Sequence, residues 1–285
     1  MPELPEVETT INDLKPDVEG RTIAEVEIPD DHAIATPSAG KFKKELAGQK
    51  IISLSRRGKH LLFKLDNGRF LIVHLRMTGS LLIKKATDEP EKFVRVIIRL
   101  TGGNAIHFRD PRRFGRMWLV DDPNNIVGNL GPEPLEADFT PAVLASILKG
   151  RKTPIKSTLL DQKLIAGIGN MYADEALYHA RIHPLLPAGN LKKAEIDRLF
   201  EAIQFVLRQG IREKGASTET YIRPGGIKGE AHLQFRVAHQ KGKTCPVCGG
   251  PIERIVVGQR GTFYCPRCQK LPAKRSSISA AITRR

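Results

Sequence analysis

HLLFKLDNGRFLIVHL, residues 60–75, contains two apolar runs separated by Asp66-Asn67-Gly68. Short runs rich in β-branched and aromatic residues around an Asn-Gly pair are typical of a β-hairpin. Further runs of this kind lie on both sides of it, separated by turn residues. The predicted strands are Arg21–Ile28, Lys50–Leu54, His60–Leu65, Phe70–Leu75, Ser80–Ile83, Val94–Leu100, Ala105–Phe108 and Met117–Val120. Eight strands without intervening helices predict an antiparallel β-sandwich or a flattened barrel.

Helical patterns flank this β-rich region. A short N-terminal helix is predicted over Val7–Leu14, ending before Pro16, and later helices over Thr140–Lys149, Tyr172–Ala180 and Leu191–Glu213, with Asn190 as a cap of the last. The segment 215–232, rich in Gly, Ser, Thr and Pro at its start, is expected to be a mobile loop that orders on ligand binding. The fold class is therefore α+β. The expected domains are a sandwich over 1–130, a helical domain over 131–240 that includes this loop, a zinc finger over 241–270, and a disordered basic tail over 271–285.

All four cysteines lie close together near the C-terminal end. Cys245-Pro-Val-Cys248 and Cys265-Pro-Arg-Cys268 form two Cys-x-x-Cys pairs. This spacing predicts four thiolates around one zinc ion, with a β-hairpin between the pairs. Four protein ligands leave no open position for a substrate, so the zinc is expected to be structural. Arg260 lies at the turn of the hairpin, where it could contact a phosphate.

Charge indicates the kind of partner. The chain of 285 residues has 46 Lys and Arg against 31 Asp and Glu, a net charge of +15. This excess favours a polyanion such as nucleic acid. No apolar run approaches the roughly 20 residues that span a bilayer, and the N-terminus lacks the pattern of a signal peptide. A cytoplasmic protein without membrane contact is expected.

The chain begins with Met1-Pro2-Glu3-Leu4-Pro5-Glu6, which places reactive chemistry at its end. Removal of Met1 would leave Pro2 with a free secondary amine, which is partly unprotonated at neutral pH. Such an amine can attack an aldehyde-like carbon and form a cationic iminium, an electron sink. Glu3 could transfer the protons that this chemistry requires.

Other candidate residues lie in turns and at helix starts. Lys59 follows a basic pair and could reach a phosphate or a sugar oxygen. In Asp110-Pro-Arg-Arg-Phe-Gly115, Phe114 could wedge into a base stack while Arg112 bonds to the unpaired base, and Met77 could fill the vacated space. Gly167-Ile-Gly-Asn170, just before a helix, could bind an anion, with Asn170 as a donor.

These motifs together resemble bacterial formamidopyrimidine-DNA glycosylase. The matching stretches are the N-terminal Met-Pro-Glu-Leu-Pro-Glu-Val-Glu-Thr, Lys59, residues 110–115, Leu130-Gly-Pro-Glu-Pro-Leu135, Lys156, Gly167–Tyr172 and the zinc ribbon with Gln259-Arg-Gly-Thr-Phe-Tyr264. The resemblance implies a sandwich domain, a helix-two-turn-helix domain and a zinc finger. It also implies a base-excision DNA repair enzyme that removes oxidised purines and cleaves the abasic strand by β- and δ-elimination. The expected partner is damaged double-stranded DNA, bound by a monomer without an obligate protein partner.

The resemblance also implies residue roles. Pro2 would be the nucleophile, Glu3 the proton donor and acceptor, and Lys59 and Arg260 catalytic helpers. Contacts to DNA would come from Met77, Arg112, Phe114, Lys156, Asn170 and Arg260. Glu6 would help to position the base or the N-terminus.

The sequence departs from the family at Gly229-Glu-Ala-His232 and Val237-Ala-His239, which leaves the damaged base uncertain. Two alternatives stay open. One is an endonuclease VIII-like glycosylase for oxidised pyrimidines. The other is a zinc-ribbon DNA-binding protein without catalysis, against which the presence of both Pro2 and Glu3 argues.

Overall fold

The computed structural model describes residues 1–218 and 220–272, so the predicted disorder of the basic tail lies almost entirely outside the described residues. The chain divides into two compact units. The first comprises Met1–Leu130 and Gln209–Leu233, and the second Gly131–Arg208 and the chain from Gln234 onward. The loop that we assigned to the helical domain therefore belongs to the first unit. In the described part of the chain, no helix combines the length and the apolar character needed to cross a membrane.

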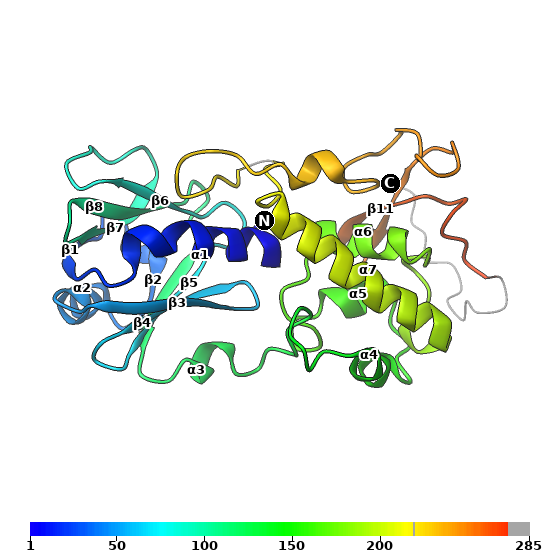
Figure 1. Ribbon diagram of the computed structural model, residues 1–285, viewed down its shortest axis with the longest axis horizontal. Helices are drawn as coiled ribbons and strands as arrows, with labels where there is room; N and C mark the ends of the chain where they lie inside the picture. Colours follow the sequence, from blue (N-terminus) through cyan, green and yellow to red (C-terminus); the bar gives the residue numbers. More distant parts are fainter. Residues whose placement is uncertain (219, 273–285) are drawn as a thin grey trace. The chain divides into compact units, whose positions relative to one another are not determined.

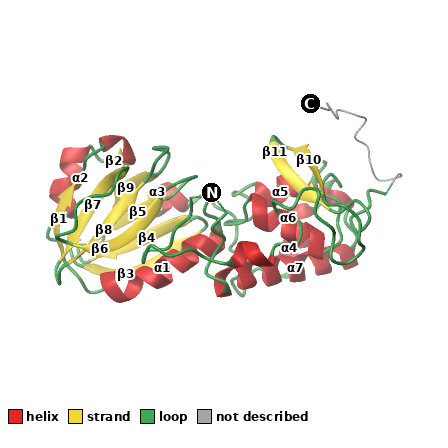
Figure 2. Cartoon of the chain, turned by 90° about the horizontal axis from the view of Figure 1, so that it is seen from above, coloured by secondary structure: helices red, strands yellow, loops and turns green. Residues whose placement is uncertain are grey.

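The first unit is a β-sandwich of two sheets, which Figure 2 shows as layers. The four-stranded sheet has the order β1 (Ile23–Glu27), β7 (Val94–Leu100), β8 (Asn104–Arg109), β6 (Ser80–Lys85). The five-stranded sheet has the order β2 (Ile34–Thr36), β9 (Arg116–Val120), β5 (Phe70–His74), β4 (His60–Leu65), β3 (Ile51–Arg57). The core between them contains side chains from both sheets, such as Phe63 of β4 and Phe108 of β8. The sandwich prediction is confirmed.

One strand and one helix that precede β3 in the chain order of the first unit were not predicted. Strand β2 and helix α2 (Ala39–Leu46) lie between β1 and β3, so the expectation of eight strands without intervening helices is wrong. Strand β2 pairs in parallel with β9, which makes the second sheet mixed rather than purely antiparallel. Both elements are short, and α2 buries only Phe42 and Leu46. Two apolar positions are too few to give a helical period.

Helix α1 (Leu4–Val18) is longer than predicted and contains Pro16. Proline is tolerated there because it lies in the last turn, where the Glu19 N–H still donates to the Lys15 carbonyl at 3.0 Å. Val7, Ile11 and further apolar residues of α1 are buried in the sandwich core. The predicted helix end before Pro16 is therefore wrong, because burial of Val18 outweighs the loss of one backbone donor.

The second unit is helical and ends in a β-hairpin (Figure 1). Its helices are α4 (Pro141–Leu148), α5 (Ile155–Leu160), α6 (Asn170–His179) and α7 (Lys193–Arg212), and α7 continues beyond the unit boundary. The hairpin consists of β10 (Glu253–Val257) and β11 (Arg260–Tyr264). Short elements complete the chain, namely α3 (Asn124–Val127), η1 (Asp31–Ala33), η2 (Ala188–Asn190) and η3 (Ala231–Gln234). Asn190 closes η2 and does not cap α7, so that prediction is wrong.

Candidate active site and nucleic-acid interface

The N-terminus is fixed rather than frayed. Pro2 is buried and Glu3 is 2% exposed, whereas Met1 before them is 37% exposed. Glu3 is the N-cap of α1 in a capping box with Glu6: the Glu3 side chain accepts from the Glu6 backbone N–H. In return, the Glu3 N–H donates to Glu6 Oε2 at 2.8 Å. The structure thus brings Pro2, Glu3 and Glu6 together.

Glu6 also connects α1 with the segment Gln209–Leu233. Its carboxylate is fully buried, and Oε1 accepts from the Ala216 N–H at 2.7 Å. The Tyr221 hydroxyl donates to the Glu6 carbonyl at 3.1 Å. A bidentate ion pair between Arg223 and Asp13, at 2.7 and 3.1 Å, adds a further link to α1. These bonds explain why the segment packs with the first unit.

Lys59 lies in the turn between β3 and β4 and is 6% exposed. Arg56 holds this turn, because its Nη1 donates to the Gly58 carbonyl at 3.0 Å. The Nε of the same guanidinium pairs with Glu8 of α1 at 2.9 Å. Arg56 therefore connects the Lys59 turn with the helix that begins beside Pro2.

Two histidines next to this turn, the half-buried His60 and the buried His74, were not singled out from the sequence. The rings of His60 and His74 make an edge-on contact at 4.5 Å. Burial lowers the pKa of His60 to about 4, and burial likewise lowers the pKa of His74. His74 Nδ1 accepts from the Arg76 N–H at 2.9 Å. A single histidine in an apolar strand gives no sequence signal, so only the structure could pair these two.

Met77, Arg112 and Phe114 lie on two turns of the sandwich. Met77 is half-buried, whereas Arg112 is exposed and Phe114 is 45% exposed. The Arg112 guanidinium lies 4.7 Å from the centre of the Phe114 ring, a cation–π contact. An exposed aromatic ring stacked with a cation suits contact with a nucleobase.

Lys156 lies against the hairpin that carries Arg260. It is fully buried in the second unit, where its ammonium contacts Asp174 Oδ1 at 2.7 Å, Thr262 Oγ1 at 2.8 Å and the Gly261 carbonyl at 3.1 Å. Burial raises the pKa of Asp174 to about 7, and Lys156 opposes that shift. Lys156 thus binds strand β11 rather than presenting its charge at the surface.

Asn170 and Arg260 meet at the same hairpin. Asn170 Nδ2 donates to the Gly261 carbonyl at 3.0 Å. Arg260, which precedes Gly261 in the chain, is exposed. Asn170 begins α6, directly after Gly169, the N-cap. The structure therefore groups Lys156, Asn170 and the Arg260 turn, although they are far apart in sequence.

The four cysteines hold one structural zinc ion. Their sulfur atoms all lie within 4.8 Å of one another, with Cys245–Cys268 at 3.8 Å and Cys248–Cys265 at 3.4 Å. A tetrahedral zinc with Zn–S bonds of about 2.3 Å needs sulfur–sulfur distances of about 3.8 Å, so the four thiolates fit. They occupy every position of such a site, which excludes a substrate at the metal.

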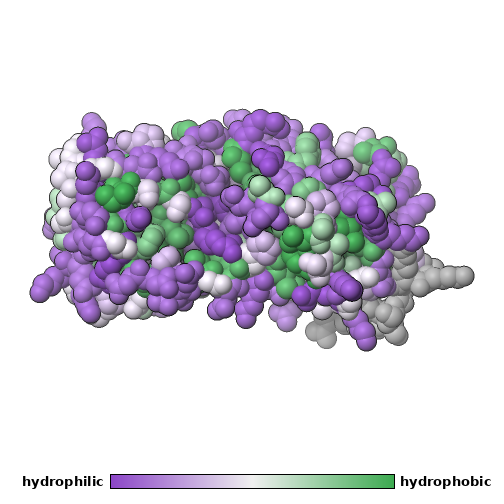
Figure 3. Space-filling view, turned by 60° about the horizontal axis from the view of Figure 1, so that its bottom comes forward, coloured by the Kyte–Doolittle hydropathy of each residue, from purple (hydrophilic) through white to green (hydrophobic). Residues whose placement is uncertain are grey.

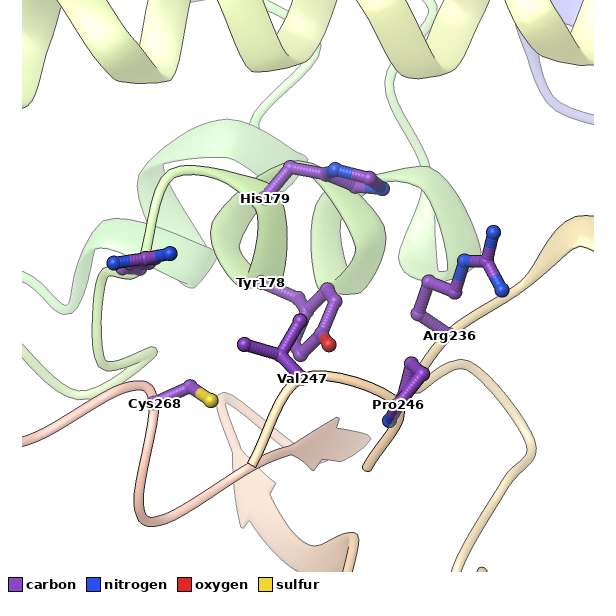
Figure 4. A pocket seen from close by; sticks show the side chains of 7 residues that line it. Tyr178, His179, Arg236, Pro246, Val247 and Cys268 are labelled. Carbon is purple, nitrogen blue, oxygen red and sulfur yellow. The ribbon is translucent and has the colours of Figure 1, made fainter. Parts of the chain in front are cut away.

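A pocket of about 340 Å³ lies beside the zinc site (Figure 4). It is lined by Tyr178, His179, Arg181, Arg236, Pro246, Val247 and Cys268. Inside its wall, the Tyr178 hydroxyl lies 3.3 Å from Cys245 Sγ.

Hydrophilic side chains cover much of the molecular face in Figure 3, which accords with the high net charge.

A capped N-terminal Pro-Glu pair on a β-sandwich, joined to a helical unit with a four-cysteine zinc hairpin, defines a zinc-ribbon DNA glycosylase. Three family models match the chain in order: the formamidopyrimidine-DNA glycosylase N-terminal domain over residues 1–117, its H2TH domain over 130–221, and the zinc finger found in FPG and IleRS over 242–271. The chain belongs to the formamidopyrimidine-DNA glycosylase family.

Individual relatives are similar to this chain over nearly its whole length. The formamidopyrimidine-DNA glycosylase of Chloroflexus aurantiacus is 45% identical, covering 94% of this chain and 98% of its own. That of Protochlamydia amoebophila is 42% identical, covering 95% and 100%. Among solved structures, the MutM (Fpg) protein of Thermus thermophilus has a TM-score of 0.85 at 40% identity, covering 94% and 98%. Lactococcus lactis Fpg bound to DNA containing an abasic site has a TM-score of 0.89 at 33% identity, covering 94% and 100%.

Proposed function

We propose that Pro2 is the nucleophile with which this glycosylase excises oxidised purines from duplex DNA and then cleaves the abasic strand. After removal of Met1, the Pro2 nitrogen bonds to C1′ of the damaged nucleotide, and the glycosidic bond breaks with its electron pair going to the base. The Pro2 nitrogen loses its proton, and the C1′–O4′ bond then breaks with its electron pair going to O4′, which takes up a proton as the sugar ring opens. The Pro2–C1′ bond thereby becomes a cationic iminium, which acidifies the neighbouring sugar protons, so that β- and then δ-elimination release the strand ends. Glu3 donates and accepts the protons at the sugar.

The observation that carries this proposal is the fixed position of Glu3 beside Pro2. Most N-termini are poorly ordered, whereas here the second residue is buried and the third caps a helix. Glu6 holds the Glu3 backbone and thereby the Pro2–Glu3 peptide. A group that must attack one carbon atom benefits from such fixation, because positioning removes much of the entropic barrier.

Contacts to the DNA divide into two groups. Lys59 and Arg260 assist at the phosphates and the sugar next to the lesion, and Asn170 adds a donor beside Arg260. Met77, Arg112 and Phe114 fill the space that the everted nucleotide leaves and contact the base opposite. For Lys156, expected to contact DNA, we propose support of the Arg260 hairpin, because its buried ammonium contacts Asp174 and the Gly261 carbonyl.

Oxidised purines are favoured as substrates by the relatives. Lactococcus lactis Fpg was solved with Fapy-dG-containing DNA and with DNA containing an abasic site. The family models and the relatives reported above carry the name of the purine branch, so the endonuclease VIII-like alternative is not favoured. We infer that the enzyme acts as a monomer in the cytoplasm at the nucleoid, since one chain supplies every group that the mechanism uses.

Borohydride trapping tests the proposal. The protein, a duplex with 8-oxoguanine opposite cytosine, and borohydride should give a covalent adduct that peptide mapping places on Pro2. A chain with an uncleaved N-terminal extension is the matched control and should give no adduct. An adduct on a lysine, or none even with a preformed abasic site, would refute the role of Pro2. An adduct with an oxidised pyrimidine alone would refute the substrate class.

A further inference from the structure

The turn that carries Met77 and the turn that carries Arg112 and Phe114 share one buried polar pair. Thr78 is 4% exposed and Asp110 is fully buried. The Thr78 hydroxyl donates to Asp110 Oδ1. The Arg112 N–H donates to Thr78 Oγ1 at 3.2 Å and to Asp110 Oδ1 at 3.3 Å. The Gly115 N–H donates to Asp110 Oδ2 at 2.7 Å.

Both turns have backbone conformations that need outside support. Each contains a non-glycine residue in the left-handed region, Arg76 with φ 55° and Arg113 with φ 60°. Such a conformation costs roughly 1–2 kcal/mol for a residue with a side chain. The turns are also tight, since a Cβ on Gly79 would lie 2.4 Å from the Leu75 carbonyl. A hydrogen-bonded carboxylate between the turns is a means of holding both in one conformation.

We propose that Thr78 and Asp110 are positioning residues that align Met77, Arg112 and Phe114 as one rigid wedge. The proposal rests on the void-filling role given above to those three residues. Eversion of a nucleotide costs a few kcal/mol of free energy. A wedge that first has to become ordered offsets less of this free energy, because its ordering has an entropic cost of its own. The Thr220 hydroxyl donates to the Met77 carbonyl at 3.3 Å, so the segment Gln209–Leu233 also contacts this wedge.

Isosteric variants test the proposal. Thr78→Val removes the hydroxyl and keeps the shape, whereas Thr78→Ser keeps the hydroxyl. Asp110→Asn removes the charge. Thr140→Val is a matched control, because Thr140 caps α4 in the second unit and its loss costs stability without touching the wedge. Single-turnover excision from duplex DNA is measured beside cleavage of single-stranded DNA that contains an abasic site, which needs no wedge. Fluorescence of 2-aminopurine opposite the lesion reports on the wedge directly.

Thr78→Val and Asp110→Asn are expected to slow duplex excision about tenfold or more, the loss typical of a hydrogen bond to a charged group. Cleavage of the single strand should stay within about twofold, and Thr78→Ser should restore excision. The double variant should be no slower than the slower single variant, because the two residues act as a unit. The 2-aminopurine signal should fall with excision.

Duplex excision at the wild-type rate in Thr78→Val would overturn the proposal. An equal loss on both substrates, matched by Thr140→Val at equal stability, would also overturn it and indicate a merely structural role. Met77→Ala and Phe114→Ala distinguish a failure of the void-filling role from a failure of the positioning role. If these variants excise normally, the void-filling role itself fails; if they are slow while Thr78→Val is normal, only the positioning role fails.

Discussion

Replacing Lys156 by methionine should weaken DNA binding by releasing the zinc hairpin, not by removing a phosphate contact. The ammonium has no solvent exposure and contacts Asp174, Thr262 and the Gly261 carbonyl. Asp174 in turn accepts from the Phe263 N–H at 3.0 Å. Three successive residues of β11 thus depend on one buried ion pair, and Arg260 directly precedes them.

The loss of stability expected for Lys156→Met follows from its ion pair with Asp174. Removing one partner of a buried ion pair costs about 3–5 kcal/mol. Burial already raises the pKa of Asp174 to about 7, above its usual 3.8, so in Lys156→Met the carboxyl can take up a proton and escape part of this cost. A folded-state pKa above the unfolded value favours folding at low pH, and this contribution is lost as the pH rises through the folded-state pKa. Lys156 lowers the pKa of Asp174, so in the variant this pKa lies above about 7, and stability continues to fall at pH values where the contribution of Asp174 in the wild type has levelled off. The variant should therefore lose more stability at high than at low pH, by up to about 1.4 kcal/mol per pH unit.

Urea unfolding at about pH 6 and 8.5 would measure this difference, with DNA binding measured in parallel. Asp174→Asn should weaken binding as Lys156→Met does, and Lys156→Met combined with Asp174→Leu should recover much of the stability. Lys193→Met is the control, because Lys193 is 92% exposed in a surface pair and should cost less than about 1 kcal/mol. If Asp174→Asn binds DNA normally while Lys156→Met does not, the lysine contacts the DNA itself and this reasoning is refuted.

Three other predictions concern Glu3 and the zinc site. Glu3→Gln should slow excision of an intact lesion about 10²–10⁴-fold while Pro2 still traps a preformed abasic site, and an unchanged single-turnover rate would contradict the role of Glu3. Removing zinc with a chelator should abolish DNA binding by unfolding the Arg260 hairpin, so binding after complete zinc loss would contradict it. Tyr178→Phe should release zinc to a chelator at least about tenfold faster, since Cys245 loses a hydroxyl contact at 3.3 Å; release at the wild-type rate would show that this contact is inert.

Those parts of the fold that rest on local patterns could be predicted from the sequence. The strands His60–Leu65 and Val94–Leu100 were predicted with the bounds that the structure has, because apolar runs end at clear turn residues. Strand β2 and helix α2 were missed because their burial depends on distant partners, Met117 in the case of β2. The attachment of the segment Gln209–Leu233 to the first unit depends on contacts of the same long-range kind.

For the candidate site, too, contacts between residues far apart in sequence could not be predicted. A reactive role for Pro2 and Glu3 could be proposed from residue type and position, and zinc binding could be predicted from the cysteine spacing. The burial of Lys156 could not, because lysine is almost never fully buried unless it is paired and its partners lie up to 106 residues away. The departure from the family at His239 was visible, yet only the structure shows that His239 takes a left-handed conformation with φ 61°.

Buried carboxylates position the proposed functional groups throughout the chain. Glu6 and Asp110 have no exposed surface, Asp174 is 1% exposed and Glu175 is 2% exposed. Each accepts backbone N–H groups of a segment beside a candidate residue, and Glu175 binds those of Arg236, Val237 and Ala238 before the zinc ribbon.

A buried charge costs several kcal/mol unless hydrogen bonds replace its hydration, so these four groups are not placed there for stability alone. A surface that binds phosphates cannot use exposed carboxylates to hold its loops, because they would repel the DNA. Basic side chains that held the loops would no longer be available to contact phosphates. Carboxylates under the surface avoid both conflicts, which explains how a chain with a net charge of +15 can order a basic interface with acidic residues.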